Sequence, residues 1–573
     1  MSSPSRRTVL GAAAAAAAFL SYEPVPASAV PPSFTTAPPV GLPFGLVPYL
    51  RRFQNWAGEI VTSPLWTVLP ATAAQCVALA NWGAQRGWKI RPLGKMHNWS
   101  PLTVRGDETD NSNVLLVDTS LGLRGLSIRS SPSRVSVGTG VTMEELLLRL
   151  ELAGRGIMHH PAPGNITVGG ALAIAGHGTA IPANGERRSA GHSYGSLSNL
   201  IMDLDAIVWD AGANAYVLKT FRRNDPAIAP LLTHVGRAFI TRVTLAVGPR
   251  QHMRCRSYTN IPATELLAAP GSSGRTVDSF LRSAGRMEVI WYPFTANPWL
   301  KVWSLTGALP PLGSRPVLTP YNYPFSDNLP KPITDLVNAI LTGDTAQAPS
   351  FGATQYNITA AGLVSNLATD LWGTGRNLML YVKPTTLRVT ANGYAIICRR
   401  SDVQPILYEF GSMYRERLDA YRAAGKYPSN GPVEIRVTGV DNPADSQVAG
   451  AVDPWLSPTR RVPDRPDLDT AVWLDILTLP GTATAMEFFT EVEQWILSRY
   501  SGGDTRVRVE WSKGWGYTNS GAWTSSQVID GVVPASLTQG QPGGTQYADA
   551  AAALRAYDPA GIYTSPLTSQ LFG

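Results

Sequence analysis

The stretch TVLPATAAQCVALANWGAQRGWKIRPLGKMHNWSPLTV, residues 67–104, decides the architecture of the first half of this chain. Its first residues are typical of a strand, and the alanine-rich part between Ala71 and Arg86 has the apolar periodicity of a helix. A second apolar strand leads into a loop that is punctuated by glycine and proline and contains one histidine, His97. The order strand, helix, strand, loop predicts strands covered by a helix, with His97 presented directly after a strand.

A second glycine-rich segment follows farther along the chain. Three short apolar runs, NVLLVDT, LSIRS and RVSVG, precede a helix that a capping box of Thr142 and Glu145 is expected to start. The run PAPGNITVGGALAIAGHGTA, residues 161–180, then has five glycines and no Asp, Glu, Lys or Arg. Together with the loop at Gly94 it suits a diphosphate, because consecutive backbone N–H groups can bind an anion. Neither loop matches a Rossmann or P-loop pattern, and tight turns remain the alternative for glycines alone.

The amino-acid composition of the chain changes beyond Gly248. The part that follows is rich in aromatic residues and proline, as in IWYPFTANPWLKVW at residues 290–303. TTLRVTANGYAIICRR predicts a hairpin around Asn392-Gly393, followed by a helix and the strand PVEIRVTGV. AVWLDILTL predicts a strand, Thr484 with Glu487 is expected to cap a helix, and TRVRVEWSKGW predicts a further strand. This order favours an α+β domain with a largely antiparallel sheet and helices on one face.

The N-terminus reads as a targeting segment. SRRTVLGAAAAAAAFL places paired arginines before an apolar run, and Ala27-Ser28-Ala29 offers a small-residue cleavage site. The pattern favours a twin-arginine signal, with an ordinary secretory signal as the alternative. We therefore expect an exported bacterial protein whose mature part, residues 30–573, holds two or three domains.

Cysteine use and charge exclude several classes of function. Cys76, Cys255 and Cys398 are widely separated, no Cys/His cluster suggests a metal site, and we expect these residues to lie in the core. The net charge of +7 is spread without a basic run, which argues against reading of nucleic acid and weakly for association with anionic surfaces.

Several longer strings carry a specific resemblance. They are RPLGKMHNWSPLTV, PAPGNITVGGALAIAGHG, YGSLSNLIMDLDAIVWD, RNDPAIAPLLTHVGR, EVIWYPFT, YNYPFSDNLP, GPVEIR and EWSKGW. With them the chain resembles the vanillyl-alcohol-oxidase type of FAD-linked oxidases and, within it, the covalent-flavin (type II) cholesterol oxidases. The resemblance implies an α+β fold: a two-subdomain FAD-binding domain at 56–249 and a sterol-binding domain with a large antiparallel sheet flanked by helices at 250–515. A signal at 1–29, a Pro-rich lead-in at 30–55 and a C-terminal segment at 516–573 that returns to the FAD domain complete this division.

The resemblance also implies a covalent link between His97 and the flavin 8α carbon. A neutral imidazole suits this chemistry because it is a good nucleophile toward an electrophilic flavin. His177 in AGHG is the rival attachment point, whereas structural or solvent roles are expected for His159, His160, His192, His234 and His252. The other expected cofactor contacts are Arg91, Gly94, Lys95, Met96, Asn98, Ser100, Pro163, Gly164, Thr167, Gly169, Gly170, Gly178 and Asn199.

Two charged residues of one strand match a pair in that family. Glu434 and Arg436 share a face with Thr438 because side chains alternate along a strand. The resemblance implies that the pair gates a path for oxygen and interacts with the reduced flavin. An exposed pair would matter little.

Three further residues match family positions near the flavin or the sterol. Glu288 precedes the aromatic run at Trp291, so burial is expected to raise its pKa and suit it to move the proton of steroid isomerisation. The alternative is a surface glutamate before a buried strand. Lys513 implies positive charge beside the flavin. Asp475 stands where the family has Asn, so a buried carboxylate there would change the charge of the site.

Taken together, the resemblance implies a secreted flavoprotein oxidase. Its substrate is a 3β-hydroxysteroid such as cholesterol, its product is the 4-en-3-one, and O2 is reduced to H2O2. FAD performs the redox step, and a peripheral contact with lipid membranes is a possible partner interaction. Two alternatives stay open: an oxidase of another alcohol, such as a sugar, alditol or lactone, and a non-catalytic sterol-binding flavoprotein.

Overall fold

The computed structural model describes residues 37–573 except 108, 132 and 328–330. The expected signal at 1–29 lies outside the described residues. The end of the expected Pro-rich lead-in, by contrast, is the strand β1, Tyr49–Gln54. Within the described ranges, no helix is both long and apolar enough to cross a membrane.

The first sheet has four strands, and two of them are the predicted strands on either side of the predicted helix. Its order is β1, β2 (Val61–Val68), β4 (Val114–Asp118) and β3 (Lys89–Leu93), and β4 is parallel to both β2 and β3. The helix α2 (Ala73–Arg86) starts at an N-cap, where the Thr72 hydroxyl accepts from the backbone N–H of Gln75, and ends before Gly87 in the left-handed region. Its apolar face, which includes Cys76 and Leu79, packs between this sheet and the next.

The second sheet has five antiparallel strands. Their order is β5 (Leu126–Ser130), β6 (Ser133–Gly138), β10 (Phe239–Ala246), β8 (Ile201–Asp210) and β9 (Ala215–Arg222). The predicted cap of α3 (Met143–Leu152) is confirmed because the Thr142 hydroxyl accepts from the N–H of Glu145. The Glu145 carboxylate pairs with Arg124 instead of completing the capping box. Short elements complete this half of the chain: β7 (Arg155–Gly156), α4 (Val168–Ala173), α5 (Ala229–Leu232) and β11 (Gly248–Pro249).

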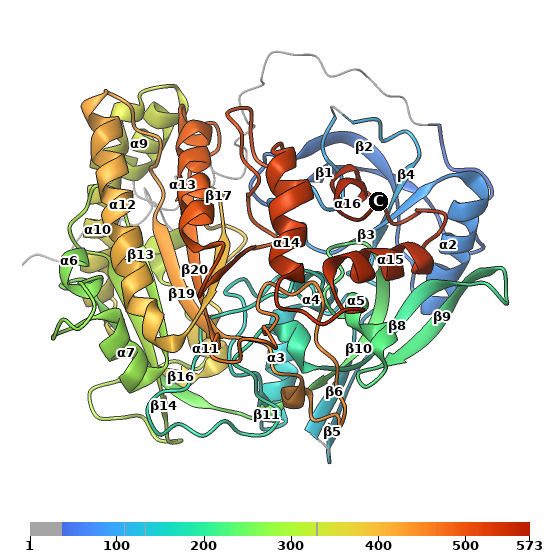
Figure 1. Cartoon of the computed structure of the whole chain (residues 1–573), viewed down its shortest axis with the longest axis horizontal. Coiled ribbons are helices and arrows are strands. Elements are labelled where there is room, and N and C mark those ends of the chain that lie inside the picture. The colour runs from blue at the N-terminus through green and yellow to red at the C-terminus, as the bar shows by residue number, and fades with distance from the viewer. Residues whose placement is uncertain (1–36, 108, 132, 328–330) are drawn as a thin grey trace, which may run out of the picture.

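The third sheet forms the other half of the molecule and is almost wholly antiparallel (Figure 1). Its strand order is β15 (Arg315–Pro316), β16 (Asp370–Thr374), β12 (His252–Tyr258), β14 (Trp299–Thr306), β13 (Arg286–Trp291), β19 (Val433–Gly439), β20 (Thr470–Thr478), β18 (Tyr394–Cys398) and β21 (Arg506–Val509). The short β17 (Thr390–Ala391) also pairs with β20. The helices of this half are α6 (Ala263–Leu266), α7 (Val277–Ala284), α8 (Pro324–Asp327), α9 (Lys331–Leu341), α10 (Ala348–Ser365), α11 (Gly375–Met379), α12 (Val403–Ala423) and α13 (Ala485–Tyr500). The expected α+β fold with a large antiparallel sheet flanked by helices is confirmed.

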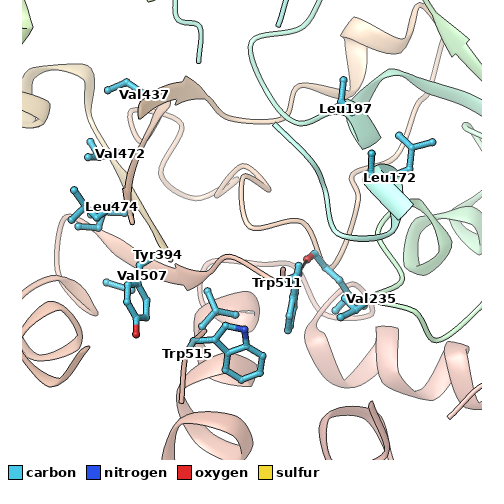
Figure 2. Close-up of a cluster of buried hydrophobic side chains, with 14 of the residues drawn as sticks. Leu172, Leu197, Val235, Tyr394, Val437, Val472, Leu474, Val507, Trp511 and Trp515 are labelled. Carbon is cyan, nitrogen blue, oxygen red and sulfur yellow. Dashed lines mark hydrogen bonds between the residues drawn. The ribbon is translucent and has the colours of Figure 1, made fainter. Parts of the chain in front are cut away.

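One apolar cluster joins the two halves. Figure 2 shows Leu172 and Leu197 from the first half on one side, Val472 and Leu474 of β20 on the other, and Trp511 among them. The two halves therefore share one core. Burial of each such side chain contributes roughly 1.5–3 kcal/mol to its stability. All three cysteines are buried, as expected, and all three are free.

The hairpin expected at Asn392-Gly393 is wrong. β17 and β18 both pair with β20 in one register, Thr390 opposite Thr478 and Tyr394 opposite Leu474, so they are two parts of one interrupted strand. The Asn392 side chain supplies the link, because its Oδ1 accepts from the N–H of Ile476 at 2.7 Å.

The cap expected at Thr484 is also wrong. Thr484 adopts φ 61° and its hydroxyl donates to the Ala483 carbonyl, so it makes no capping bond to α13. Glu487 pairs instead with Lys426, which follows the end of α12. The helix is held by its apolar face, which includes Phe488 and Phe489.

The last residues pack against the first half of the chain. α14 (Val533–Thr538), α15 (Tyr547–Tyr557) and α16 (Pro566–Phe572) return to the side of the molecule that holds β1–β4 (Figure 1). There the Ile562 carbonyl accepts from the N–H of Ile90 in β3 at 2.7 Å.

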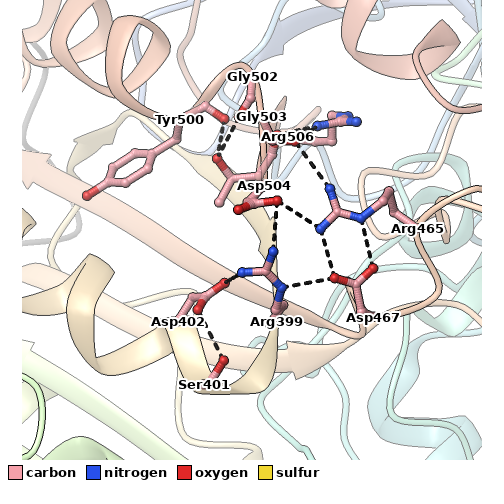
Figure 3. A network of polar contacts seen from close by, with 11 residues as sticks. Arg399, Ser401, Asp402, Arg465, Asp467, Tyr500, Gly502, Gly503, Asp504 and Arg506 are labelled. Atoms are coloured by element: carbon pink, nitrogen blue, oxygen red, sulfur yellow. Dashed lines mark hydrogen bonds and ion pairs between the residues drawn. The ribbon is translucent and has the colours of Figure 1, made fainter.

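An exposed ion network ties three loops of the second half together (Figure 3). Arg399 pairs with Asp467 at 2.9 Å and with Asp504 at 2.7 Å, and Arg465 pairs with the same two carboxylates. Such exposed pairs contribute little stability, so the packed core, and not this network, holds the sheet.

Candidate active site

A cavity of about 460 Å³ lies between the two halves of the chain. Its wall is formed by the two glycine-rich loops, by aromatic and aliphatic side chains of the third sheet and its helices, and by charged side chains. Most of the residues singled out in the sequence meet here: Gly94, Lys95, Met96, His97, Asn98, Pro163, Thr167, Gly169, Gly170, His177, Gly178, Glu288, Glu434, Arg436 and Lys513.

The two glycine loops approach each other so closely that side chains would not fit. A Cβ atom on Gly94 would lie 2.1 Å from the Thr167 hydroxyl oxygen, and one on Gly169 would lie 2.8 Å from Cβ of Thr139. Thr167 also caps α4, whose first turn contains Gly169 and Gly170. The wall here is therefore bare backbone that a ligand can approach closely. The N–H groups of Gly169 and Gly170 donate to the Thr139 carbonyl and the Thr167 hydroxyl, whereas those of residues 95–98 have no acceptor among the described residues and fit the diphosphate of FAD.

His97 lies in the first glycine-rich loop and lines the cavity. Its side chain is partly buried, its ring centre lies 4.8 Å from that of Trp56, and its Nδ1 has no hydrogen-bond partner among the described residues. Burial and the positive charge of Lys513 lower its pKa to about 4. The imidazole is therefore neutral at physiological pH, as nucleophilic attack on a flavin requires.

Hydrogen bonds to a turn that is distant in sequence hold the loop that carries His97. The Ser512 carbonyl accepts from the N–H groups of Trp99 at 2.8 Å and of Ser100 at 3.2 Å, and the Ser100 hydroxyl donates to the Trp511 carbonyl. This contact places Lys513 near the loop, with its Nζ 4.2 Å from the centre of the Trp99 ring.

Four of the expected cofactor contacts do not line the cavity. Ser100 is fully buried in the tether just described, and Gly164 packs against Glu144 of α3. Asn199 is buried in a network with Ser193 and the Asn442 carbonyl. Arg91 points away because the alternation of β3 places its side chain on the face opposite Pro92, which does line the cavity. Proximity in sequence to Gly94 is thus no guide to side-chain direction.

His177 is fully engaged by the protein. Its ring stacks on that of Trp473 with centroids 3.5 Å apart, its Nδ1 contacts the Gly178 carbonyl oxygen, and its Nε2 lies 3.8 Å from a Glu510 carboxylate oxygen. These contacts fix the ring, whereas Nδ1 of His97 is unengaged.

The register of the third sheet builds a row of charged residues across four strands. Glu288 on β13 lies directly opposite Lys301 on β14 and opposite Arg436 on β19. Two residues along, Glu434 on β19 lies opposite Asp475 on β20. Directly opposite side chains of antiparallel strands share a face, so the charges gather on the cavity side.

The expectation that Glu288 has a raised pKa is wrong. Burial alone would raise it, but Lys301 at 3.6 Å and Arg436 at 2.9 Å, with a hydrogen bond from the Tyr381 hydroxyl, outweigh burial and lower the pKa. Glu288 is also no surface glutamate, since it is 1% exposed. It is a buried, ionised carboxylate on the cavity wall.

Arg436 is the centre of the charged row. Its guanidinium contacts the carboxylates of Glu288, Glu434 and, at 2.8 Å, Asp475. Asp475 does not itself line the cavity but lies behind Arg436 and 3.6 Å from Lys513. Burial and the neighbouring Glu510 carboxylate raise the pKa of Asp475 to about 8, against the opposing charges of Lys513 and Arg436.

A glycine makes room for this cluster. A Cβ atom on Gly393 would lie 2.7 Å from Cγ of Lys513 and 2.9 Å from carboxylate oxygens of Asp475 and Glu510. The Asn-Gly pair that resembles a hairpin turn is thus an interruption of a strand, and the absence of a side chain on Gly393 leaves space for these charged groups.

Some residues of the site were missed in the sequence. Glu510 lines the cavity, and Lys513 and His177 outweigh its burial to lower its pKa to about 2. Lys301 is fully buried with its Nζ 3.0 Å from the centre of the Tyr381 ring. The signal for Lys301 was a lysine inside the apolar strand WLKVW. His160 and His234 also line the cavity, although no pattern in the sequence indicated that position.

The remaining wall is apolar and suits a rigid hydrocarbon. Trp299, Tyr323 and Phe325 pack edge to face or tilted, with centroids 4.9–5.9 Å apart, and all three line the cavity. Such a wall takes up an apolar ring system without offering hydrogen bonds along its length.

Comparison with known proteins agrees with this geometry. A family model described as "Cholesterol oxidase, substrate-binding" matches residues 252–573, and one described as "FAD binding domain" matches residues 64–196. A solved structure described as a solvent-stable cholesterol oxidase is 51% identical, with 94% of this chain and 100% of that chain covered and a TM-score of 0.92. The cholesterol oxidase of Brevibacterium sterolicum is 41% identical over 94% of this chain and 99% of its own, also with a TM-score of 0.92.

More distant relatives share less. The L-gulonolactone oxidase of Mus musculus is 22% identical over 255 residues, 43% of this chain and 50% of its own. The chain thus spans about half the length of the curated relatives that it matches. The substrate-binding model covers more than half of the chain, and the relative with 51% identity is covered from end to end. The chain therefore belongs to the cholesterol oxidase family and carries the FAD-binding domain of that family.

Proposed function

We propose that the protein is an exported FAD-dependent oxidase that converts a 3β-hydroxysteroid to the 4-en-3-one and reduces O2 to H2O2. One observation carries this proposal. A single cavity is lined by the bare glycine cradle, a neutral histidine, a set of aromatic side chains and a cluster of charged side chains. The cradle suits a diphosphate, and the apolar wall suits a sterol better than a polyol.

FAD, when bound, supplies the two-electron oxidation of the hydroxyl carbon. We propose that Gly94, Gly169 and Gly170 hold its diphosphate and that His97 is covalently attached to it. The free Nδ1 and low pKa of His97 support this choice over His177, whose ring is fixed by Trp473 and Glu510.

We assign the proton of the isomerisation to Glu288. Its ionised carboxylate lines the cavity and is held by Arg436 and Tyr381. In the 5-en-3-one, a proton on carbon 4 is acidified by the adjacent carbonyl, so a carboxylate can remove it and return it to carbon 6.

We assign Glu434 and Arg436 to the control of oxygen access. Both line the cavity and pair with each other, and the Glu434 side chain is 20% exposed whereas that of Glu288 is 1% exposed. Rotation of Glu434 away from Arg436 would exchange the ion pair for solvation and open a gap at this wall. Arg436 keeps Glu288 and Asp475 as partners, so the movement does not leave it unpaired. Lys513 supplies positive charge beside His97.

The proposal is tested by two measurements on the holoenzyme. Addition of cholesterol under anaerobic conditions should bleach the flavin absorbance, and peroxide should form with cholesterol but not with polyols in air. Activity with polyols alone would favour an oxidase of another alcohol. Bound cholesterol with an unchanged spectrum would favour a non-catalytic sterol-binding flavoprotein.

The covalent link is tested separately. The variant His97→Ala should lose flavin on denaturation while His177→Ala keeps a mass increase equal to FAD. The reverse pattern would show that His177 is the attachment point.

We further propose a peripheral contact with lipid membranes. Leu309, Leu312 and Leu318 are 82%, 99% and 80% exposed in the segment that follows β14, whose Trp299 and Trp303 line the cavity. Clustered exposed leucines are typical of a surface that meets an apolar partner, and a sterol substrate resides in bilayers. Leu312→Asp should reduce flotation with phosphatidylcholine–cholesterol vesicles, whereas Leu152→Asp on α3, at a side chain that is 76% exposed, should not. Equal flotation of both variants would argue against this surface.

A further inference from the structure

A second cavity, of about 240 Å³, lies where β3 meets the start of α16. Arg91 and Lys89 line it from alternate positions of β3, so both cations share one face of the strand. Thr564 and Ser569 line it from the C-terminal segment. None of the roles proposed above uses this cavity.

Arg91 is buried there without a partner. Its side chain is 5% exposed, and its Nε and Nη1 have no hydrogen-bond acceptor within the part of the chain that the structure describes. A buried cation without an acceptor is costly, so such groups are normally paired. Burial and the charge of Arg237 lower the pKa of Arg91 to about 9, against the opposing effect of Asp558.

The nearest buried carboxylate is already saturated. Asp558 accepts from the Tyr216 hydroxyl, from Arg237, and from the backbone N–H groups of Ile562 and Tyr563, each of the last two at 2.9 Å. It therefore belongs to Arg237 and to the turn before α16 and has no lone pair directed at Arg91.

Lys89 likewise has only neutral partners. Its Nζ donates to the Gly561 carbonyl at 2.8 Å and to the Thr564 hydroxyl at 3.3 Å. The carboxylate of Asp110 also lines the cavity, but it is exposed and accepts from the N–H of Ser112. Two cations of β3 thus face a cavity to which the described residues contribute one exposed carboxylate, so these residues carry an excess of positive charge.

We propose that this cavity binds a small tetrahedral oxyanion, phosphate or sulfate, through Arg91 and Lys89. Arginine is the common protein partner for such groups because its N–H donors match several oxygens at once. The cavity volume exceeds that of one oxyanion, so bound water can complete its hydration. Thr103 lines both cavities, but Arg91 does not line the larger one, so the site is separate from the glycine cradle.

Occupation of the site would join two distant parts of the chain. β3 runs directly into the loop that carries His97, and α16 ends the described chain. An oxyanion between Arg91 and the start of α16 would therefore fasten the C-terminal segment to the strand that leads into the cofactor loop.

Titration calorimetry of the holoenzyme with sodium phosphate, and separately with sodium sulfate, tests the proposal at constant ionic strength. The wild type should show one saturable site, and Arg91→Met should weaken it by roughly 10- to 100-fold, as expected for loss of a charged hydrogen bond. Ser569→Asp places a carboxylate at an exposed position of the cavity wall and should also weaken binding. Arg86→Met, at an exposed arginine of α2, is the control and should leave binding unchanged.

The two variants keep the test decisive. Ser569 is exposed, so Ser569→Asp should fold even if Arg91→Met does not. A preference for phosphate or for sulfate would identify the oxyanion. The absence of saturable binding to the wild type, or equal affinity in the wild type and Ser569→Asp, would overturn the proposal.

Discussion

The substitution Asp475→Asn should change how the stability of the enzyme depends on pH. The Asp475 side chain is fully buried, and its Oδ1 has no hydrogen-bond partner among the described residues. Burial and Glu510 raise its pKa to about 8, so it keeps a proton at neutral pH. Asparagine has nearly the same shape and stays neutral at every pH.

The sign of the effect follows from the direction of the pKa change. In the unfolded chain an aspartate has a pKa of about 3.9, well below the folded value. The folded state therefore binds more protons between about pH 4 and pH 8, and its stability falls as the pH rises through that window. At about 1.4 kcal/mol per pH unit, the full window corresponds to at most about 6 kcal/mol. The stabilisation by the proton on Asp475 is complete below the pKa of the unfolded chain and is lost above the pKa of the folded state.

Urea unfolding of the holoenzyme between pH 5 and pH 9 measures this difference. The stability of Asp475→Asn relative to the wild type should increase from pH 5 to about pH 8 and then stay constant. Asp504→Asn serves as the control, since this exposed carboxylate has a lowered pKa and its contribution is constant above the unfolded value. Parallel stability curves for the wild type and Asp475→Asn would refute a protonated, buried Asp475.

Two further substitutions probe the charged row. Lys301→Met removes the cation 3.6 Å from Glu288, so the pKa of Glu288 should rise and the acid limb of the kcat/KM profile should move to higher pH. The control Lys219→Met, at an exposed lysine, should leave the profile in place. An unchanged profile in Lys301→Met would show that Lys301 does not control the pKa of Glu288. Gly393→Ala places a Cβ atom 2.7 Å from Cγ of Lys513 and should cost about 1–3 kcal/mol of stability and lower kcat. Gly531→Ala, at a position with open space, should do neither, and equal behaviour of the two variants would refute the packing argument.

Helices and strands whose apolar residues recur at a regular spacing were predictable from the sequence. The helix from Ala73 to Arg86 and the strand that follows it were expected because their apolar positions recur at helical and extended spacing. The position of His97 directly after that strand was also expected. The hairpin at Asn392-Gly393 failed because a turn dipeptide says nothing about the partner strand. There β20 pairs continuously with both sides, and the glycine is required by charged side chains from other segments.

The electrostatics of the site was beyond sequence reasoning for a different reason. Aromatic neighbours of Glu288 in sequence suggested burial and a raised pKa, and the burial was correct. The sign was wrong because the deciding partners are Lys301 and Arg436. Lys301 lies on the paired strand β14, and Arg436, 148 residues away, meets Glu288 only through the register of two strands. Arg91 failed through the converse error, since nearness to Gly94 in sequence concealed the alternation that turns its side chain to another cavity.

The charge balance of the buried row explains why Asp475 keeps its proton. The cluster contains three cations and four carboxyl groups, namely Lys301, Arg436, Lys513, Glu288, Glu434, Glu510 and Asp475. A net charge in a buried cluster is costly, and one bound proton removes it. The proton stays on Asp475 because Glu288 and Glu510 have lowered pKa values whereas that of Asp475 is raised. An asparagine would provide the same neutrality permanently. With aspartate, the row gains a negative charge above about pH 8, so the electrostatic potential of the cavity beside Lys513 depends on pH.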